Sequence, residues 1–342
     1  MAERPKYTMR DVARLAGVST STVSAVINNN TPVSPERKTR VQDAMAALDY
    51  HPDAIARSLK TGISNVIGII VPDITNAFYP EVVRGAEEAA QMSGYSVLLS
   101  DSSEDFRMEE RHLINLSARR VDGVLLACCG NSAVHNSNLR RRFPIVYMDR
   151  LPPAGADYTV STDNIGSGYM AAKHLIDLGH RRIGMLTGNL DLSPHRDRLE
   201  GFRKAMQESH LPILNEYLVS GGVQIEDGVA AGRSLFELKD PPTAVMASNN
   251  KLLLGILQAA DERHLVVPDQ LSMLGFDDFV WNKYFNPSLS AVGQSTYEMG
   301  RRSFELLLQV IKSTLNGDGP ITSHVRLPAE LRIRNSTASI KK

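Results

Sequence analysis

The stretch T-M-R-D-V-A-R-L-A-G-V-S-T-S-T-V-S-A-V-I-N (Thr8–Asn28) predicts two short helices joined by a tight turn. Thr8 suits the N-cap of the first helix, and Gly17 suits the left-handed residue that ends it. Ser19 suits the N-cap of the second helix, which we expect to run from Thr20. The spacing of the apolar residues indicates that each helix buries one face.

A third helix is expected from Pro35 to about Leu48, because Ser34 suits its N-cap and proline is favoured in a first helical turn. Three helices within about fifty residues, the first two joined by an A-G-V-S turn, are typical of a helix-turn-helix unit. The sequence therefore predicts a small all-α domain at the amino terminus.

The second helix has an exposed face of small polar side chains, where a solvated helix usually carries Glu and Lys. Thr20, Ser21, Ser24 and Asn28 lie on this face. Hydroxyl and amide groups can approach base edges closely and can donate or accept hydrogen bonds there. The face suits contact with DNA, although a merely solvated polar helix is the plainer alternative.

Charge is unevenly distributed along the chain. The formal net charge of all 342 residues is +0, but residues 1–62 hold nine Lys and Arg against six Asp and Glu, a net of +3. A basic amino-terminal segment attached to a slightly acidic body indicates a small module that contacts a polyanion.

After residue 64 the chain alternates between apolar strands and amphipathic helices. The run Val66–Val71 is continuously apolar, as a parallel strand buried on both faces should be. Strands are expected at 66–71, 96–100, 123–128, 145–148, 183–187, 217–220, 244–248, 272–276 and 323–328. Helices are expected at 80–93, 108–119, 166–178, 197–209, 227–238, 251–263 and 297–316. Such alternation predicts doubly wound parallel sheets, and its length predicts two lobes.

Several classes of protein are disfavoured by the composition. The two cysteines, Cys128 and Cys129, are adjacent in an apolar run, so we expect no disulfide framework and no metal site built on cysteine. The sequence has no run of apolar residues long enough for a membrane span and no signal peptide, so we expect a cytoplasmic protein.

The sequence resembles the lactose-repressor (LacI/GalR) family of bacterial transcription regulators. The resemblance is carried by residues 8–29, by V-S-P-E-R-K-T-R-V and by Y-H-P-D-A-I-A-R-S-L (residues 50–59). It continues through the body in I-G-I-I-V-P-D-I-T-N-A-F-Y, V-D-G-V-L-L, H-L-I-D-L-G-H-R-R-I-G, R-D-R-L-E-G-F and L-G-F-D-D. These motifs occur in the family's order and cover essentially the whole chain.

The resemblance implies a domain plan and a function. A helix-turn-helix domain (1–50) is followed by a hinge helix and linker (51–64) and a periplasmic-binding-protein-like body (65–342). The lobe nearer DNA would comprise about 65–162 and 293–325, and the farther lobe about 163–292 and 326–342. The protein would be a homodimeric regulator, most often a repressor, that binds a near-palindromic operator on double-stranded DNA. A small effector, a sugar or sugar derivative bound between the lobes, would control this binding.

The resemblance also assigns the DNA contacts. The second helix would lie in the major groove, and a short hinge helix would enter the minor groove, where Leu59 would wedge into a base step. Asp53 stands where members of the family commonly have asparagine. Its carboxylate adds negative charge near the DNA phosphates, which disfavours a phosphate contact at this position. The implied DNA-binding residues are Thr8, Thr20, Ser21, Thr22, Ser24, Ala25, Asn28, Ala56, Arg57 and Leu59.

The implied effector site lies at the carboxyl ends of the strands of both lobes. Charged and amide side chains there suit a ligand rich in hydroxyl groups, and an aromatic ring would supply a stacking face. The implied residues are Asp73, Asn76, Phe78, Arg198, Asn250, Asp277 and Trp281. Arg198 and Asp277 could instead pair only with each other, and Trp281 lies where the resemblance is looser.

One motif offers an alternative function. The segment Gly166-Ser-Gly168-Tyr-Met-Ala171 matches G-x-G-x-x-A, which would suit an NAD(P)-dependent enzyme. Asp163 and Asn164, just before it, look instead like helix caps, and the small residues look like packing sites. We find no catalytic constellation, expect no cofactor or metal, and favour structural roles for the two histidines at 174 and 180. The polar carboxyl terminus lacks leucine heptads, so a dimer is expected rather than a tetramer.

Overall fold

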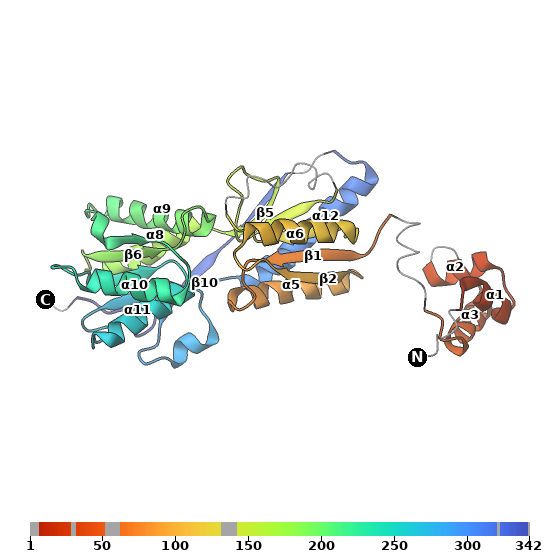
Figure 1. Ribbon diagram of the computed structural model, residues 1–342, viewed down its shortest axis with the longest axis horizontal. Helices are drawn as coiled ribbons and strands as arrows, with labels where there is room; N and C mark the ends of the chain where they lie inside the picture. Colours follow the sequence, from red (N-terminus) through yellow and green to blue (C-terminus); the bar gives the residue numbers. More distant parts are fainter. Residues whose placement is uncertain (1–6, 29–31, 52–61, 131–141, 320–321, 341–342) are drawn as a thin grey trace. The chain divides into compact units, whose positions relative to one another are not determined.

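A computed structural model describes residues 7–28, 32–51, 62–130, 142–319 and 322–340 (Figure 1). The chain divides into two compact units, Met1–Ser64 and Asn65–Lys342. The predicted hinge contacts Ala56, Arg57 and Leu59, and the residue Asp53, lie outside the described residues. No helix in the described part of the chain is long and apolar enough to cross a membrane.

The first unit contains three helices, α1 (Met9–Ala16), α2 (Thr20–Asn28) and α3 (Pro35–Ala47). Their shared core consists of small and β-branched side chains: Val12, Ala13, Ala16, Val23, Val41 and Ala44. Small core residues let short helices approach closely, so about forty residues can bury a continuous core. The predicted helix-turn-helix unit is confirmed.

The caps of these helices follow the sequence prediction with one exception. The Thr8 backbone N–H and hydroxyl both donate to the Asp11 carboxylate, at 2.9 and 2.7 Å. Gly17 has a φ of +61°, and the Ser19 hydroxyl oxygen accepts from the Thr22 backbone N–H at 3.2 Å. The exception is α3, where Ser34 is the N-cap residue, as predicted, but its side chain makes no capping hydrogen bond.

The second unit is built on two six-stranded sheets with matching strand order. Sheet A has the order β11-β5-β4-β3-β1-β2 and sheet B the order β12-β10-β9-β8-β6-β7. The strands of sheet A are β1 (Val66–Val71), β2 (Ser96–Asp101), β3 (Gly123–Leu126), β4 (Ile145–Met148), β5 (Tyr158–Thr162) and β11 (Ser323–Leu327). Those of sheet B are β6 (Ile183–Thr187), β7 (Leu218–Ser220), β8 (Ala244–Ala247), β9 (Ser272–Phe276), β10 (Ser290–Gln294) and β12 (Ala329–Arg332).

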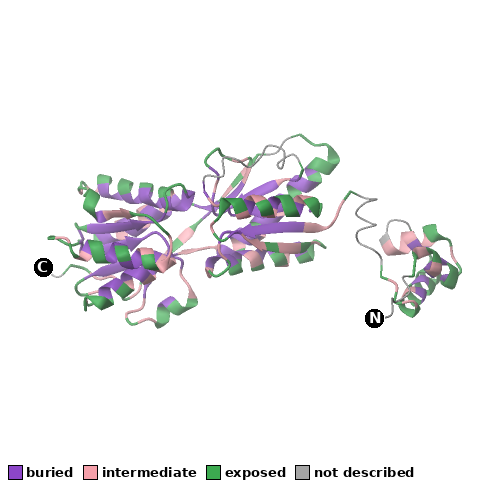
Figure 2. Ribbon diagram, in the orientation of Figure 1, coloured by how far each residue is buried: buried purple, intermediate pink, exposed green. Residues whose placement is uncertain are grey.

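Helices cover both faces of each sheet, which makes the buried strands apolar on both sides (Figures 1 and 2). On sheet A, α5 (Phe78–Met92) and α12 (Thr296–Asn316) share one core and α6 (Phe106–Ala118) packs in another. On sheet B, α8 (Asn164–Asp177) and α9 (Ser193–Glu208) cover one face, and α10 (Ile225–Phe236) and α11 (Asn250–Glu262) cover the other. We call sheet A with its helices lobe A, and sheet B with its helices lobe B. Short 3-10 helices at Asn215–Tyr217 and Val280–Tyr284 complete lobe B.

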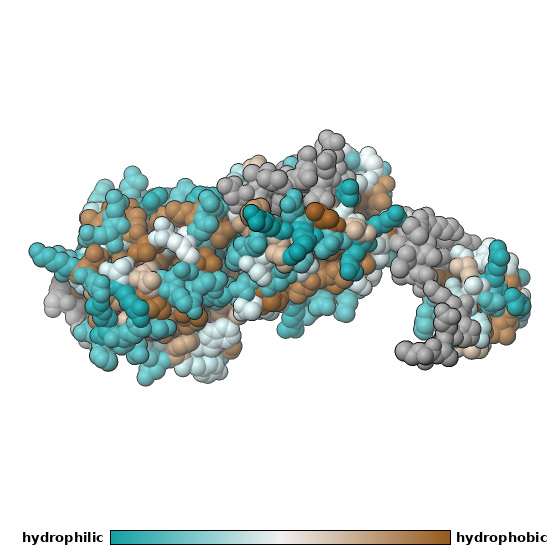
Figure 3. Space-filling view, viewed as in Figure 1, coloured by the Kyte–Doolittle hydropathy of each residue, from teal (hydrophilic) through white to brown (hydrophobic). Residues whose placement is uncertain are grey.

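The two predicted doubly wound lobes are confirmed, except that sheet B has an antiparallel strand at one edge. All strand pairs are parallel except β10 and β12, which are antiparallel. The chain passes from sheet A to sheet B after β5, returns after β10, and crosses again between β11 and β12. Three adjacent crossovers therefore connect the lobes. Side chains of hydrophilic residues are spread over the face of this unit shown in Figure 3, with apolar patches between them.

Candidate functional site

A cavity lies where the strand ends of the two lobes meet. Its lining is mostly polar: Asn76, Phe78, Tyr79, Asp149, Arg150, Pro194, His195, Arg198, Asn249, Asp277 and Gln294. Four residues of the predicted effector site, Asn76, Phe78, Arg198 and Asp277, are brought together here. The cavity holds about 40 Å³, far less than the ~300–1,000 Å³ of usual ligand pockets.

Arg198 lines this cavity and is almost completely buried. Its Nε donates to Asn164 Oδ1 at 2.8 Å, and its Nη1 donates to the carbonyl oxygen of Ser248 at 2.6 Å. The guanidinium carbon lies 4.0 Å from the centre of the Phe276 ring. Burial lowers the pKa of Arg198, while the carboxylates of Asp277 and Asp149 act to raise it. Fixed hydrogen bonds on two sides make this side chain a rigid part of the wall.

Two buried carboxylates face this arginine. Asp277 accepts a hydrogen bond from Gln294 Nε2 at 2.7 Å, and Asp149 accepts one from the Tyr79 hydroxyl at 3.0 Å. Burial raises the pKa of both carboxyls, and the positive charge of Arg198 opposes the rise. Ionised carboxylates with unused lone pairs can accept several further hydrogen bonds.

Arg150 brings a second positive charge, but a carboxylate already satisfies it. Its Nη1 and Nη2 donate to Glu104 at 2.6 and 2.8 Å, and such fork-like pairing leaves little affinity for another anion. In the lining itself, the two carboxylates of Asp149 and Asp277 match the two guanidinium groups of Arg150 and Arg198. Glu104 lies outside the lining and adds one negative charge beside Arg150.

His195 is a lining residue that the sequence reasoning missed. It is buried, and its Nδ1 lies 2.7 Å from the Ser248 hydroxyl oxygen. Burial lowers the pKa of His195 well below its usual value, and the positive charges of Arg198 and Arg150 act in the same direction. The imidazole is therefore neutral at pH 7 and adds no charge to the cavity.

Asn250 links the two lobes beside the cavity. Its Nδ2 lies 3.3 Å from Asn76 Oδ1, which also accepts from the Phe78 backbone N–H at 3.1 Å. The Oδ1 atom of Asn250 is buried and has no hydrogen-bond partner within the described residues. An orphaned acceptor beside a polar cavity is expected where a ligand or water supplies the donor.

Asp73 and Trp281, two further members of the predicted set, do not line the cavity. Asp73 forms an ion pair with Lys251, whose Nζ lies 2.6 Å from Oδ2. Trp281 is 42% exposed, and its ring packs 4.8 Å from that of Phe279. Both assignments to the effector site remain predictions without a contact in this structure.

The missed residues had weak but readable signals. Asp149 and Arg150 come directly after the apolar strand β4, just as Asp277 comes directly after β9. Tyr79 and Asn249 are next in the sequence to Phe78 and Asn250, which were predicted. His195 and Gln294 follow from neither position nor resemblance, because the tertiary packing alone brings them to the cavity.

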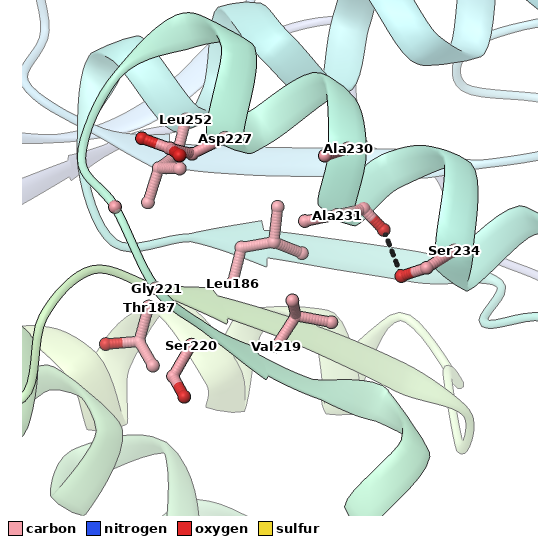
Figure 4. A pocket seen from close by; sticks show the side chains of 11 residues that line it. Leu186, Thr187, Val219, Ser220, Gly221, Asp227, Ala230, Ala231, Ser234 and Leu252 are labelled. Atoms are coloured by element: carbon pink, nitrogen blue, oxygen red, sulfur yellow. Dashed lines mark hydrogen bonds between the residues drawn. The ribbon is translucent and has the colours of Figure 1, made fainter.

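A second cavity of about 300 Å³ lies wholly within lobe B (Figure 4). It opens between the ends of β6 and β7 and helix α10, where Ala230, Ala231 and Ser234 have short side chains. It contains none of the predicted effector residues. The smaller, charged cavity between the lobes is therefore the better candidate for the effector.

The predicted DNA-reading residues lie on α2 or next to its neighbour α1. Thr20 and Ser21 are exposed, and Thr22, Ser24 and Ala25 are half-buried. Asn28 is the last residue of the helix, and Thr8 is exposed before α1. The hydroxyls of Ser21 and Thr22 lie 2.7 and 2.9 Å from that of Ser19, so part of this face is engaged in capping.

Packing accounts for the G-x-G-x-x-A segment. A Cβ on Gly168 would lie 2.2 Å from the Arg198 carbonyl oxygen, so this glycine lets α8 and α9 touch. Asp163 caps α8 by accepting from the Gly166 backbone N–H at 3.0 Å. Asn164, predicted as a cap, is instead the partner of Arg198. His174 and His180 contact Thr337 and Thr243, and no cluster of metal-ligating side chains is present in the described ranges.

Comparisons with known proteins agree with this architecture. Residues 8–53 match the family described as bacterial regulatory proteins, lacI family, and residues 172–337 match a periplasmic binding protein-like domain. The chain is 36% identical to the HTH-type transcriptional repressor PurR of Haemophilus influenzae (strain PittEE) over 336 residues, 97% of this chain and 99% of that protein. It is 38% identical to the ribose operon repressor of Escherichia coli (strain K12), covering 89% and 93% of the two chains. A solved LacI family transcriptional regulator from Enterococcus faecium with bound ribose is 27% identical with a TM-score of 0.70, covering 81% of this chain and all of that one.

Proposed function

The chain belongs to the lacI family of bacterial regulatory proteins, and on that premise we propose that it is a homodimeric repressor controlled by a neutral sugar. Helix α2 binds the major groove of a near-palindromic operator, with Thr20 and Ser21 nearest the bases. The sugar binds in the cavity between lobes A and B and changes the affinity for the operator. Two of its relatives are named as repressors, and one solved regulator of the family has bound ribose. The proposal applies both features to this chain.

The observation that carries the effector class is the charge of the cavity. The lining carboxylates of Asp149 and Asp277 balance its two guanidinium groups, and Arg150 is already paired with Glu104, which lies outside the lining. A phosphate would meet two carboxylates, while Arg150 is already paired and Arg198 already donates to Asn164 and to the Ser248 carbonyl. A neutral polyol would donate its hydroxyl hydrogens to Asp149 and Asp277 and accept from amide side chains. Phe78, buried in the same wall, can lie against the apolar face of a sugar ring.

The mechanism follows from the position of the cavity between two rigid sheets. A ligand that contacts Asp149 in lobe A and Asp277 in lobe B fixes the angle between the lobes. Because a ligand shifts an equilibrium only by its difference in affinity for the two states, the effector must bridge both lobes to control the operator. A change in the angle between the lobes would alter the hinge segment that contains Ala56, Arg57 and Leu59.

The test is a binding screen followed by a DNA assay. We expect D-ribose or a related neutral sugar to raise the melting temperature, and D-ribose 5-phosphate to do so much less. Operator duplexes are selected from a random pool with the purified protein, and their affinity is measured with and without the sugar. Selected duplexes without two-fold symmetry would refute the homodimer, and a preference for the phosphate would refute the neutral effector.

A further inference from the structure

Among the residues that the structure describes, one ion pair joins the two lobes beside the cavity. Asp73, on the loop after β1, belongs to lobe A, and Lys251, in the first turn of α11, belongs to lobe B. Asp73 Oδ2 and Lys251 Nζ are 2.6 Å apart, and the two side chains are only 16% and 18% exposed. Partial burial reduces screening by salt, so this pair is stronger than one on the open surface.

Each partner is held in place by its own lobe. Asp73 Oδ1 accepts hydrogen bonds from the backbone N–H and the hydroxyl of Thr75, at 2.8 and 2.6 Å. Lys251 Nζ also donates to Gln224 Oε1 at 2.8 Å. Burial acts to raise the pKa of Asp73, but the hydrogen bonds from Lys251 and Thr75 outweigh it and hold the pKa below its usual value. Oriented partners lose little side-chain entropy when the lobes meet.

Neither Asp73 nor Lys251 lines the cavity, although both are close in the sequence to residues that do. Asn250, the residue before Lys251, contacts Asn76, which lines the cavity. Asp73 therefore reaches lobe B without reaching the space that a ligand would fill. This differs from the effector contact that the sequence predicts for Asp73.

We propose that Asp73 and Lys251 form a latch that holds the lobes closed and sets effector affinity without touching the effector. The cavity of about 40 Å³ is too small for a sugar, so the lobes must part before a ligand enters. The ion pair stabilises this closed, empty arrangement, and the liganded arrangement, whose cavity must be larger, does not share that stabilisation. The regulatory consequence rests on the proposed function, whereas the latch itself rests on the contact between the lobes.

The latch has a kinetic signature that a ligand contact lacks. Without the ion pair, the open arrangement becomes more populated, so a sugar enters faster. Affinity rises at the same time, because a smaller fraction of the free protein is in the closed arrangement that excludes the sugar. Removing a direct contact to the sugar would instead speed its dissociation and leave its association unchanged.

The first experiment measures the distance between the lobes without any ligand. Spin labels are placed on Met92→Cys in lobe A and Lys239→Cys in lobe B, both at exposed positions. Burial raises the pKa of Cys128 to about 12 and also raises that of Cys129, so the native thiols label slowly at neutral pH. We expect Lys251→Met and Asp73→Asn each to add a population with longer distances. The charge-reversed pair, Asp73→Lys with Lys251→Asp, should restore the short distance.

The matched control is Arg233→Met, which breaks an ion pair with Glu262 that lies entirely within lobe B. It should leave the distances unchanged. Identical distance distributions in the parent protein and both latch variants would overturn the latch. So would a charge-reversed pair that stays as open as the single variants.

The second experiment uses D-ribose as the probe in stopped-flow and calorimetric titrations. We expect Lys251→Met to bind it about three- to ten-fold more tightly, a range that a partly buried ion pair supports, and to associate with it faster. A slower or unchanged association would contradict the latch. If the distances shift as expected but no protein, the parent included, binds the sugar, the latch stands and the proposed effector class fails.

Discussion

Asp149 and Asp277 occupy equivalent positions in the two lobes. Asp149 follows β4 with a φ of 60°, and Asp277 follows β9 with a φ of 70°. The backbone N–H of each donates to a valine carbonyl on the next strand, Val160 or Val292, at 2.9 Å in both cases. Aspartate tolerates the left-handed region better than most residues, which allows this turn after an apolar strand. Two matching lobes thus present two matching carboxylates to one cavity.

The pair gives the effector site a predictable pH dependence. The ionised carboxyls are the acceptors, and burial raises the pKa of both above the usual value of 3.8. As the pH falls through these raised values, the carboxyls take up protons and lose acceptor capacity. We therefore expect sugar affinity to be level near pH 7 and to decline in mildly acidic solution, earlier than an exposed aspartate would allow. Calorimetric titrations of D-ribose across pH 4 to 8 would measure this.

Asp277→Asn is the matching variant, since the amide keeps the shape and does not titrate. It should weaken D-ribose binding at pH 7 by at least about ten-fold, since hydrogen bonds to a charged group contribute ~1.5–3 kcal/mol. The remaining binding should lose part of its acid dependence. A variant that binds as tightly as the parent with the same pH profile would show that the sugar does not contact Asp277.

His195 predicts a second pH effect, this time on stability. Its folded pKa is lowered by burial, whereas the unfolded chain has the usual value near 6.5. Below pH 6.5 the unfolded state therefore binds more protons, so the free energy of unfolding falls as the pH falls towards the lowered folded pKa. The slope is at most ~1.4 kcal/mol per pH unit for one group. Denaturant unfolding of His195→Gln should show a smaller slope than that of the parent protein between pH 6.5 and 5.

Gly168→Ala tests the packing account of the glycine motif. A Cβ here would lie 2.2 Å from the Arg198 carbonyl oxygen, so α8 and α9 would have to separate. We expect a loss of about 1–3 kcal/mol in the free energy of unfolding, the usual cost of overpacking. The control is Gly221→Ala, where no atom lies within 4 Å of the added carbon. Equal effects at the two positions would contradict this account, and tight binding of NAD(P) by the parent would revive the enzyme alternative.

Most of the fold could be predicted because its strands and helices follow strong local patterns. The strands that were missed, β5, β10 and β12, are the ones beside the crossovers. β10 reads Ser-Ala-Val-Gly-Gln and β12 reads Ala-Glu-Leu-Arg, so neither has the continuous apolar run of β1. Their pairing with neighbouring strands, rather than their own composition, makes them strands.

The candidate site was less predictable because it depends on the meeting of two lobes. Arg198 could be proposed from a motif, but its partner Asn164 looked like a helix cap. Gln294 reaches Asp277 only because β10 ends beside β9. Such contacts, between residues 34 and 17 positions apart, leave no periodic pattern in the sequence.

Arg40 offers a test within the first unit. From α3, its Nε and Nη2 donate to the carbonyl oxygens of Ala16 and Gly17, at 3.0 and 2.9 Å. These carbonyls end α1 and begin the turn into α2, where a positive charge is favourable. We expect Arg40→Met to cost about 1–2 kcal/mol in the stability of this unit, seen as faster hydrogen exchange in α1 and α2. Arg14→Met, which removes an exposed ion pair with Asp11, should have little effect on this exchange.

The last prediction separates the residues of α2 that read DNA from those that hold the helix. Thr20 is exposed, and its side chain makes no hydrogen bond that would hold it within the described residues. Thr22 is half-buried, and its hydroxyl lies 2.9 Å from that of the capping residue Ser19. Thr20→Ala should therefore leave the melting temperature unchanged and alter which base pairs are preferred in a duplex selection. Ser19→Ala should instead cost about 1 kcal/mol of stability through the lost cap and weaken binding to all duplexes alike, with the preferred bases unchanged. If Thr20→Ala selects the same sequences as the parent, the base contacts lie elsewhere on α2, and Ser21 and Asn28 become the next positions to vary.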